Sequence, residues 1–282
     1  MNGWRFTLSR RWIGYLALVV VFAVACVFLS LWQLARRDEA RADIARVEQN
    51  WDAPPRPVAD VLPRLDSFDA DDKWVSVTLS GRYLTDEELL VRGRPLDGNP
   101  GFEQLVPFQL DDGRIFVVDR GWLPTGNEQD LPDIDPAPPE GPVTVVARLK
   151  AGEPVIAGRS APAGQVATIN LPTIAELVGG ELYTGAYGLL ASEDPATAAR
   201  PTAATKPVAD EGPHLSYAFQ WVAFGVMAFI GLGWAVRQEY RIRNADDPEE
   251  RVRAEARRRK AAAKPKSDAE IEDELLDAHP GG

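Results

Sequence analysis

His214 is the side chain in this sequence best suited to coordinating a metal. The chain contains two histidines, His214 and His279, and one cysteine, Cys26. In the stretch "PHLSYAFQW" (213–221), Pro213 suits the first turn of a helix, so His214 is expected near a helix N-terminus. The positive end of the helix dipole favours a neutral imidazole, which can bind a metal ion. His214 also opens an uncharged run, where ionisable residues are functional candidates.

Helical spacing places His214 on a stripe of aromatic and small residues. The other members of the stripe are Tyr217, Ala218, Trp221, Gly225, Ala228 and Leu232. Three of them are small enough to admit another helix or a flat ligand at close range. However, a histidine among tyrosine and tryptophan at a membrane interface is often only an amphipathic anchor. The residues alone leave both interpretations open.

Other chemistries lack the residues that they need. The sequence has no Gly-rich phosphate loop, no G-x-S-x-G, no H-E-x-x-H and no C-x-x-C. Copper(I) delivery calls for several thiolates or thioethers, and the chain offers Cys26, Met1 and Met227. Asp119 and Arg120, in "VVDRGW", could form a catalytic pair, but an exposed ion pair at a strand end is the simpler interpretation. We therefore expect no catalytic residue and no enzyme activity.

Two uncharged runs predict membrane-spanning helices. Residues 12–35 and 214–236 contain no charge, and about 20 apolar residues suffice to cross a bilayer. Aromatic residues flank both runs, as in interfacial belts: Trp12, Tyr15, Trp32, Tyr217, Trp221 and Trp234. The segment ending at Cys26 loosely resembles a lipoprotein cleavage box. Because the run stays apolar beyond this cysteine, an uncleaved anchor is the better interpretation.

Basic residues predict the orientation of the spans. Arg5, Arg10 and Arg11 precede the first span, and "RVRAEARRRK" (251–260) follows the second. Basic flanks stay cytoplasmic, so both termini are expected inside. The net charge of −11 argues against nucleic acid, which calls for a basic footprint. The predicted organisation is a cytoplasmic N-terminus (1–11), a first transmembrane helix (12–35), an external β-rich domain with a linker (36–212), a second transmembrane helix (213–236) and a charged, partly disordered cytoplasmic tail (237–282).

The external region is typical of a β domain. Alternating runs rich in β-branched and aromatic residues predict strands at 73–84, 88–95, 101–110, 114–124, 143–150, 165–171 and 182–190. Residues 36–50 are expected to continue the first helix, and 192–213 to be a loose linker. The predicted fold class is an α+β membrane protein, with two transmembrane helices flanking a small mixed sheet or partly closed barrel.

One short helix is expected inside this domain, at residues 171–180. Pro172 suits its first turn, and Thr173 and Glu176 have the spacing of a capping box. Gly179 and Gly180 are expected to end it.

Three separated motifs share their order and spacing with one known family. "SLWQLARR" (30–37) ends the first span, and residues 89–124 contain Arg-Pro, Gly-Phe, Pro-Phe and Arg-Gly-Trp-x-Pro in turn. The third motif is the His-Leu-x-Tyr-Ala-x-x-Trp of residues 214–221. Over about residues 10–240, the chain resembles the Surfeit locus protein one (Shy-type) assembly factors of haem–copper cytochrome c oxidase.

The resemblance implies help in building the haem a-containing catalytic subunit of the oxidase in a bacterial plasma membrane. It makes His214 the axial ligand of a transiently bound haem a, with Tyr217 and Trp221 lining the macrocycle. Arg36 or Arg120 could pair with the haem propionates, because a guanidinium fork fits a carboxylate. Trp32, Gln33 and Arg36 are expected at the same outer level of the membrane. The implied partners are the catalytic subunit, haem a synthase and membrane lipid.

A structural role is the alternative to haem binding. In that case the protein is a scaffold or accessory subunit of the oxidase or its supercomplex. The small residues Ala218, Gly225 and Ala228 would then form a helix interface, and His214 would be an interfacial anchor.

Overall fold

The chain forms two compact units in the computed structural model, which describes residues 3–127 and 130–263. One unit joins Met1–Arg37 to Pro213–Gly282, and the other is Asp38–Gly212. The first contains both predicted spans, and the second contains the predicted β domain. The predicted disorder of the extreme C-terminal tail, with His279, lies outside the described residues.

Two long helices carry the apolar runs. Helix α1 (Arg10–Asn50) follows the 3₁₀ helix η1 (Gly3–Leu8), and helix α4 (His214–Arg243) precedes helix α5 (Pro248–Ala262). The expected continuation of the first helix through residues 36–50 is confirmed. In the most apolar windows of α1 and α4, only 11% and 6% of the residues are buried. Apolar surface of this extent needs a lipid cover, so the chain is a membrane protein.

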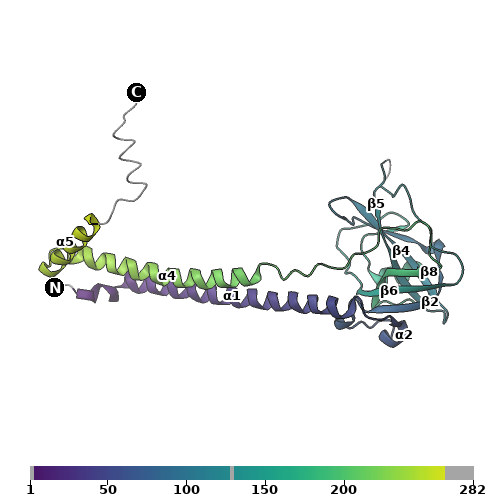
Figure 1. The fold of residues 1–282 in the computed structure, drawn as a ribbon, viewed down its shortest axis with the longest axis horizontal. Helices are drawn as coiled ribbons and strands as arrows, with labels where there is room; N and C mark the ends of the chain where they lie inside the picture. The colour runs from purple at the N-terminus through teal and green to yellow at the C-terminus, as the bar shows by residue number, and fades with distance from the viewer. Residues whose placement is uncertain (1–2, 128–129, 264–282) are drawn as a thin grey trace, which may run out of the picture. The chain divides into compact units, whose positions relative to one another are not determined.

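The second unit is built around a closed five-stranded β-barrel (Figure 1). The order of pairing around the ring is β2–β6–β8–β5–β4 and back to β2, and only the β5–β8 pair is parallel. This order, with Greek-key connections, is that of an OB-type barrel. The strands are β1 (Arg56–Pro57), β2 (Ser76–Tyr83), β3 (Leu89–Arg92), β4 (Gly101–Leu110), β5 (Ile115–Pro124), β6 (Val143–Ala151), β7 (Gln165–Val166) and β8 (Ala186–Asp194).

Gly81 allows the barrel to close. Strand β2 pairs with β6 up to Gly81 and from Gly81 onward with β4, so it bends between its two neighbours at this residue. A Cβ atom at Gly81 would lie 1.9 Å from the carbonyl oxygen of Gln109. Glycine is therefore required at this barrel corner.

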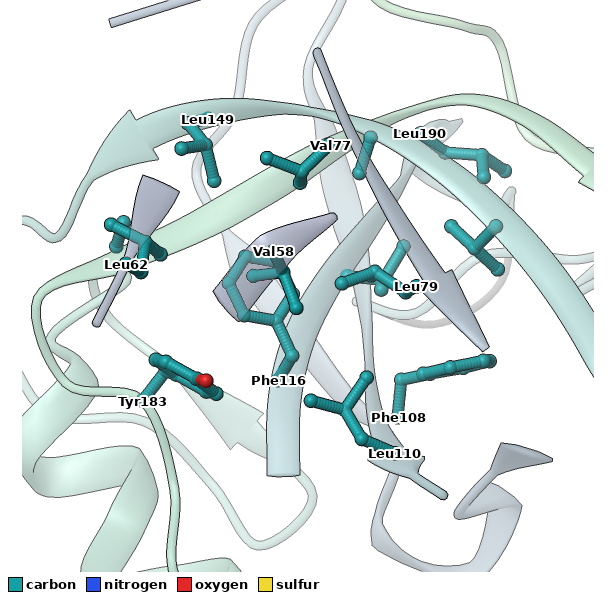
Figure 2. Close-up of a cluster of buried hydrophobic side chains, with 14 of the residues drawn as sticks. Val58, Leu62, Val77, Leu79, Phe108, Leu110, Phe116, Leu149, Tyr183 and Leu190 are labelled. Carbon is teal, nitrogen blue, oxygen red and sulfur yellow. The ribbon is translucent and has the colours of Figure 1, made fainter. Parts of the chain in front are cut away.

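All five barrel strands contribute side chains to the core of the barrel. Figure 2 shows residues from β2, β4, β5, β6 and β8 gathered with Val58, Leu62 and Tyr183. Val58 and Leu62 come from the short helix α2 (Val58–Val61) and the residue after it. A second cluster on the other face of β5 packs against helix α3 (Leu171–Val178). Alternate residues of β5 therefore enter different cores.

The structure corrects three details of the predicted elements. The N-cap of helix α3 is Asn170 and not Thr173. The Asn170 side chain accepts a hydrogen bond from the backbone N–H of Thr173, so the helix begins at Leu171. Within the run predicted as strand at 165–171, only Gln165–Val166 is a strand. Strand β8 starts at Ala186 and ends at Asp194, so the predicted loose linker begins too early.

Candidate functional site

His214 is the first residue of α4, and its ring contacts Gln33 of α1. Pro213 is the N-cap of α4, one position before the first turn where the sequence predicts it, and its carbonyl oxygen accepts a hydrogen bond from the backbone N–H of Tyr217. His214 Nδ1 lies 2.9 Å from Gln33 Oε1, although the two residues are 181 positions apart in the sequence. The expectation that Gln33 lies at the level of the histidine is confirmed.

This contact determines which nitrogen of His214 can bind a metal. An amide oxygen only accepts hydrogen bonds, so in the neutral tautomer that makes this bond Nδ1 carries the proton and donates to Gln33 Oε1. The lone pair then remains on Nε2. A ligand histidine is commonly held in this way, because the second-shell acceptor fixes the tautomer and the orientation of the ring.

Aromatic and basic side chains lie near this pair on the same two helices. Tyr217 and Trp32 are 47% and 54% exposed, whereas Trp221 is half-buried and has an edge-to-face contact with Phe224. The Arg36 guanidinium lies 5.9 Å from the centre of the Trp32 ring. The haem contacts predicted for Tyr217, Trp221 and Arg36 remain predictions.

The small-residue stripe of α4 packs against α1. Ala218 is 3% exposed, and a Cβ atom at Gly225 would lie 3.7 Å from Cys26 Cβ and 3.9 Å from Ala23 Cα. Cys26 is 2% exposed and packs as a small buried hydrophobe. The two helices run side by side through this contact (Figure 1). Ala218 and Gly225 of the stripe therefore face α1.

Arg120 lies in the interior of the β domain. The residue is 1% exposed, and its Nη2 is 3.1 Å from Glu193 Oε1. The Nη1 of Arg120 donates to Gln104 Oε1 and to the backbone oxygen of Pro136. The second carboxylate oxygen of Glu193 accepts a hydrogen bond from the Tyr83 hydroxyl. Arg120 is the extra residue of a β-bulge in β5, because its neighbours Asp119 and Gly121 pair with consecutive residues of β4. A pairing of Arg120 with a haem propionate remains a prediction, and it would require this buried ion pair to open.

The predicted exposed ion pair between Asp119 and Arg120 is wrong. Asp119 is 3% exposed and accepts from the backbone N–H of Gly121. Burial raises its pKa to about 8, and the negative charge of Glu103 adds to this effect. The alternation of side chains along β5 and the bulge direct the two residues to different partners.

The segment after β8 is tied to the Arg-Gly-Trp motif. Thr202 and Trp122 exchange two backbone hydrogen bonds of 2.8 Å, and Lys206 Nζ lies 2.7 Å from Asp52 Oδ2. A Cβ atom at Gly121 would lie 2.4 Å from the carbonyl oxygen of Thr202. We call residues 201–206 the strap. The predicted loose linker is therefore fixed to the barrel along this stretch.

The start of α4 offers one candidate ligand for a metal, His214. Within residues 3–127 and 130–263, no three His, Cys, Asp or Glu side chains are grouped so that they could hold a metal ion. A single imidazole whose other nitrogen is held by an amide would be the one protein ligand of a haem iron, since the porphyrin supplies its own nitrogen ligands.

Comparison with known proteins places the chain in a family. The model of the SURF1 family matches residues 20–226, a range that includes both halves of the His214–Gln33 contact. The chain belongs to the SURF1 family. It is 35% identical over 246 residues to a SURF1-like protein of Mycobacterium tuberculosis, covering 86% of this chain and 89% of the relative. The yeast "Cytochrome oxidase assembly protein SHY1" is 30% identical over 121 residues, which is 42% of this chain and 30% of the yeast protein.

The SURF1 motifs have separate roles in the structure. The first and third motifs supply Gln33 and His214, which form one site, whereas the central motif supplies Arg120 and Gly121, which hold the barrel and the strap. Sequence reasoning missed Glu193 and Gln104, the buried partners of Arg120. Gln104 lies within the central block but is not one of its motif residues, and Glu193 lies outside it, so only the barrel register reveals them.

Proposed function

We propose that this SURF1 protein assists the assembly of cytochrome c oxidase. Membership of the family and the name of the yeast relative support this role. Two membrane helices and a separate β domain also suit a factor that works on a membrane-embedded enzyme. The basic residues before α1 and after α4 support a topology with both termini in the bacterial cytoplasm and residues 38–212 outside.

The proposed assistance is transient binding of haem a at His214, and the contact between His214 and Gln33 carries this proposal. Haem a would supply an iron centre with an open axial position. His214 Nε2 would occupy that position, and Gln33 would keep Nδ1 protonated and the ring oriented. Exposed Tyr217 and Trp32 would exclude water from the site.

A single axial histidine suits delivery. One protein ligand to the iron gives a bond that a second protein can replace, whereas electron-transfer haems are usually held by two axial ligands. The recipient would be the catalytic subunit of the oxidase, and haem a synthase is the corresponding candidate donor.

The visible spectrum of the protein, purified from cells that make haem a, tests this proposal. The wild-type protein is expected to carry haem a absorption, and His214→Ala is expected to lose it. His279→Ala is the matched control, because it removes the only other histidine and should keep full occupancy. Full haem occupancy in His214→Ala would show that His214 is not the ligand.

Variants of Gln33 test the second part of the site. Gln33→Leu removes the acceptor for Nδ1 and should weaken haem binding by about 10- to 100-fold, the usual effect of losing a second-shell partner. Gln33→Glu keeps an acceptor and should restore occupancy. Wild-type protein that co-purifies stoichiometrically with mature oxidase and contains no haem would instead support the scaffold role.

A further inference from the structure

A basic pocket lies at the end of α4 that is opposite His214. Its lining residues come from η1, from the last turns of α4 and from α5: Trp4, Gly233, Arg237, Tyr240, Arg241, Glu250, Arg253 and Arg257. The pocket encloses about 440 Å³, which is within the usual range for small-ligand sites. All three elements belong to the same compact unit.

The pocket has an excess of positive charge. Four guanidinium groups face one carboxylate, that of Glu250, which is 7% exposed and lies 2.6 Å from Arg257 and 3.7 Å from Arg253. Among the described residues, Arg237 and Arg241 have no ion-pair partner. Arg253 also pairs with Glu249, which is outside the lining, at 3.1 Å. Two positive charges therefore remain unbalanced, which suits an anion.

Aromatic and apolar residues place this pocket at a boundary between lipid and water. Trp4 and Tyr240 stack with ring centres 4.2 Å apart, and Trp4 is 54% exposed. Trp234, which is 68% exposed, follows Gly233 at the end of the apolar part of α4. Amphipathic aromatic side chains favour the level of the lipid head groups. An anion that fits here therefore has an apolar part next to the helix.

We propose that this pocket binds the phosphodiester group of an anionic phospholipid. The forked guanidinium groups of Arg237 and Arg241 match the phosphate oxygens, and the acyl chains follow the exposed apolar surface of α4. Basic pockets beside membrane helices commonly recognise such head groups. The site holds α5 at the membrane surface and is independent of haem binding at His214.

Native mass spectrometry of the full-length protein in a neutral detergent tests this inference. Phosphatidylglycerol is the probe. Phosphatidylcholine, whose phosphodiester is balanced by a quaternary ammonium so that the lipid has no net charge, is the zwitterionic comparison, and inorganic phosphate is the free-anion comparison. Wild-type protein should retain phosphatidylglycerol preferentially. The double variant Arg237→Gln and Arg241→Gln should bind it at least about tenfold more weakly, since each basic residue near a membrane surface contributes appreciably to anionic lipid binding.

The matched control is the double variant Arg258→Gln and Arg259→Gln. It removes the same charge from exposed positions of α5 outside the pocket, and it should retain nearly wild-type affinity. If both double variants lost the same affinity for phosphatidylglycerol, general surface charge would explain the binding, and the proposal would be overturned. Inorganic phosphate that competes as well as the lipid would overturn the choice of ligand. Circular dichroism checks that each variant keeps its helices.

Discussion

At the scale of residues, two arginines with the same predicted partner have very different surroundings. Arg36 is exposed and lies over the Trp32 ring, whereas Arg120 is enclosed with Glu193. Removing one member of a buried ion pair typically costs about 3–5 kcal/mol, because the other charge stays buried without a partner. Replacing Arg120 alone should therefore destabilise the barrel. Sequence alone could not distinguish the two, because the burial of Arg120 depends on a bulge and on Glu193 in another strand.

Asp119 predicts an unusual pH dependence of stability. Its pKa is raised from 3.8 to about 8, mainly by burial, so the folded domain holds a proton that the unfolded chain releases near pH 4. This stabilisation is complete below about pH 4 and is lost as the pH rises through about 8. In the wild-type protein the free energy of unfolding should therefore decrease as the pH rises from 5 to 8. Asp119→Asn should make this decrease smaller, by up to about 1.4 kcal/mol per pH unit.

Urea unfolding of the full-length protein, followed by tryptophan fluorescence across this pH range, measures the effect. Asp112→Asn is the control, because hydrogen bonds from the Arg114 side chain hold the pKa of this exposed carboxyl below its usual range. It should leave the slope between pH 5 and 8 unchanged. A wild-type slope that persists in Asp119→Asn would show that Asp119 is already ionised at pH 5.

At the scale of elements, the sequence predicts the strands well and their closure poorly. Strand β4 has its predicted bounds, and β5 begins one residue after the prediction, since the alternation of side chains is a local signal. The closure of the barrel depends on the bend at Gly81 and on pairing of strands far apart in the sequence. The local sequence pattern shows neither the bend nor the long-range pairing, so the sequence alone could not distinguish a mixed sheet from a partly closed barrel.

The strap provides a test of the Arg-Gly-Trp motif. Gly121→Ala would place a Cβ atom 2.4 Å from the carbonyl oxygen of Thr202, so the two backbone hydrogen bonds to Trp122 should break. Hydrogen exchange of the strap should then become at least about tenfold faster, because it loses the pairing that protects it. Gly158→Ala is the control: its φ is also positive, but no atom lies within 4 Å of the new Cβ. Unchanged protection in Gly121→Ala would contradict this role.

At the scale of the whole chain, the two membrane helices make one site from distant motifs. The sequence correctly predicts which face of α4 carries the small residues, because helical spacing is a local property. It does not identify the partner of that face, which could be a ligand, another protein or the first span. The structure gives the first span, through Gly225 and Cys26, and the same pairing brings Gln33 to His214. Packing of α1 against α4 is therefore a condition for the proposed haem site.

This dependence can be tested through Cys26, the only cysteine of the chain. Gly225→Leu should force α1 and α4 apart, because a Cβ at position 225 already lies in van der Waals contact with Cys26 and leaves no space for a larger side chain. The rate of maleimide labelling of Cys26, which is 2% exposed, should rise severalfold, and haem occupancy at His214 should fall with it. Gly231→Leu is the control, since no atom lies within 4 Å of a Cβ there. Labelling of Cys26 at the wild-type rate in Gly225→Leu would mean that the two helices do not pack through these residues.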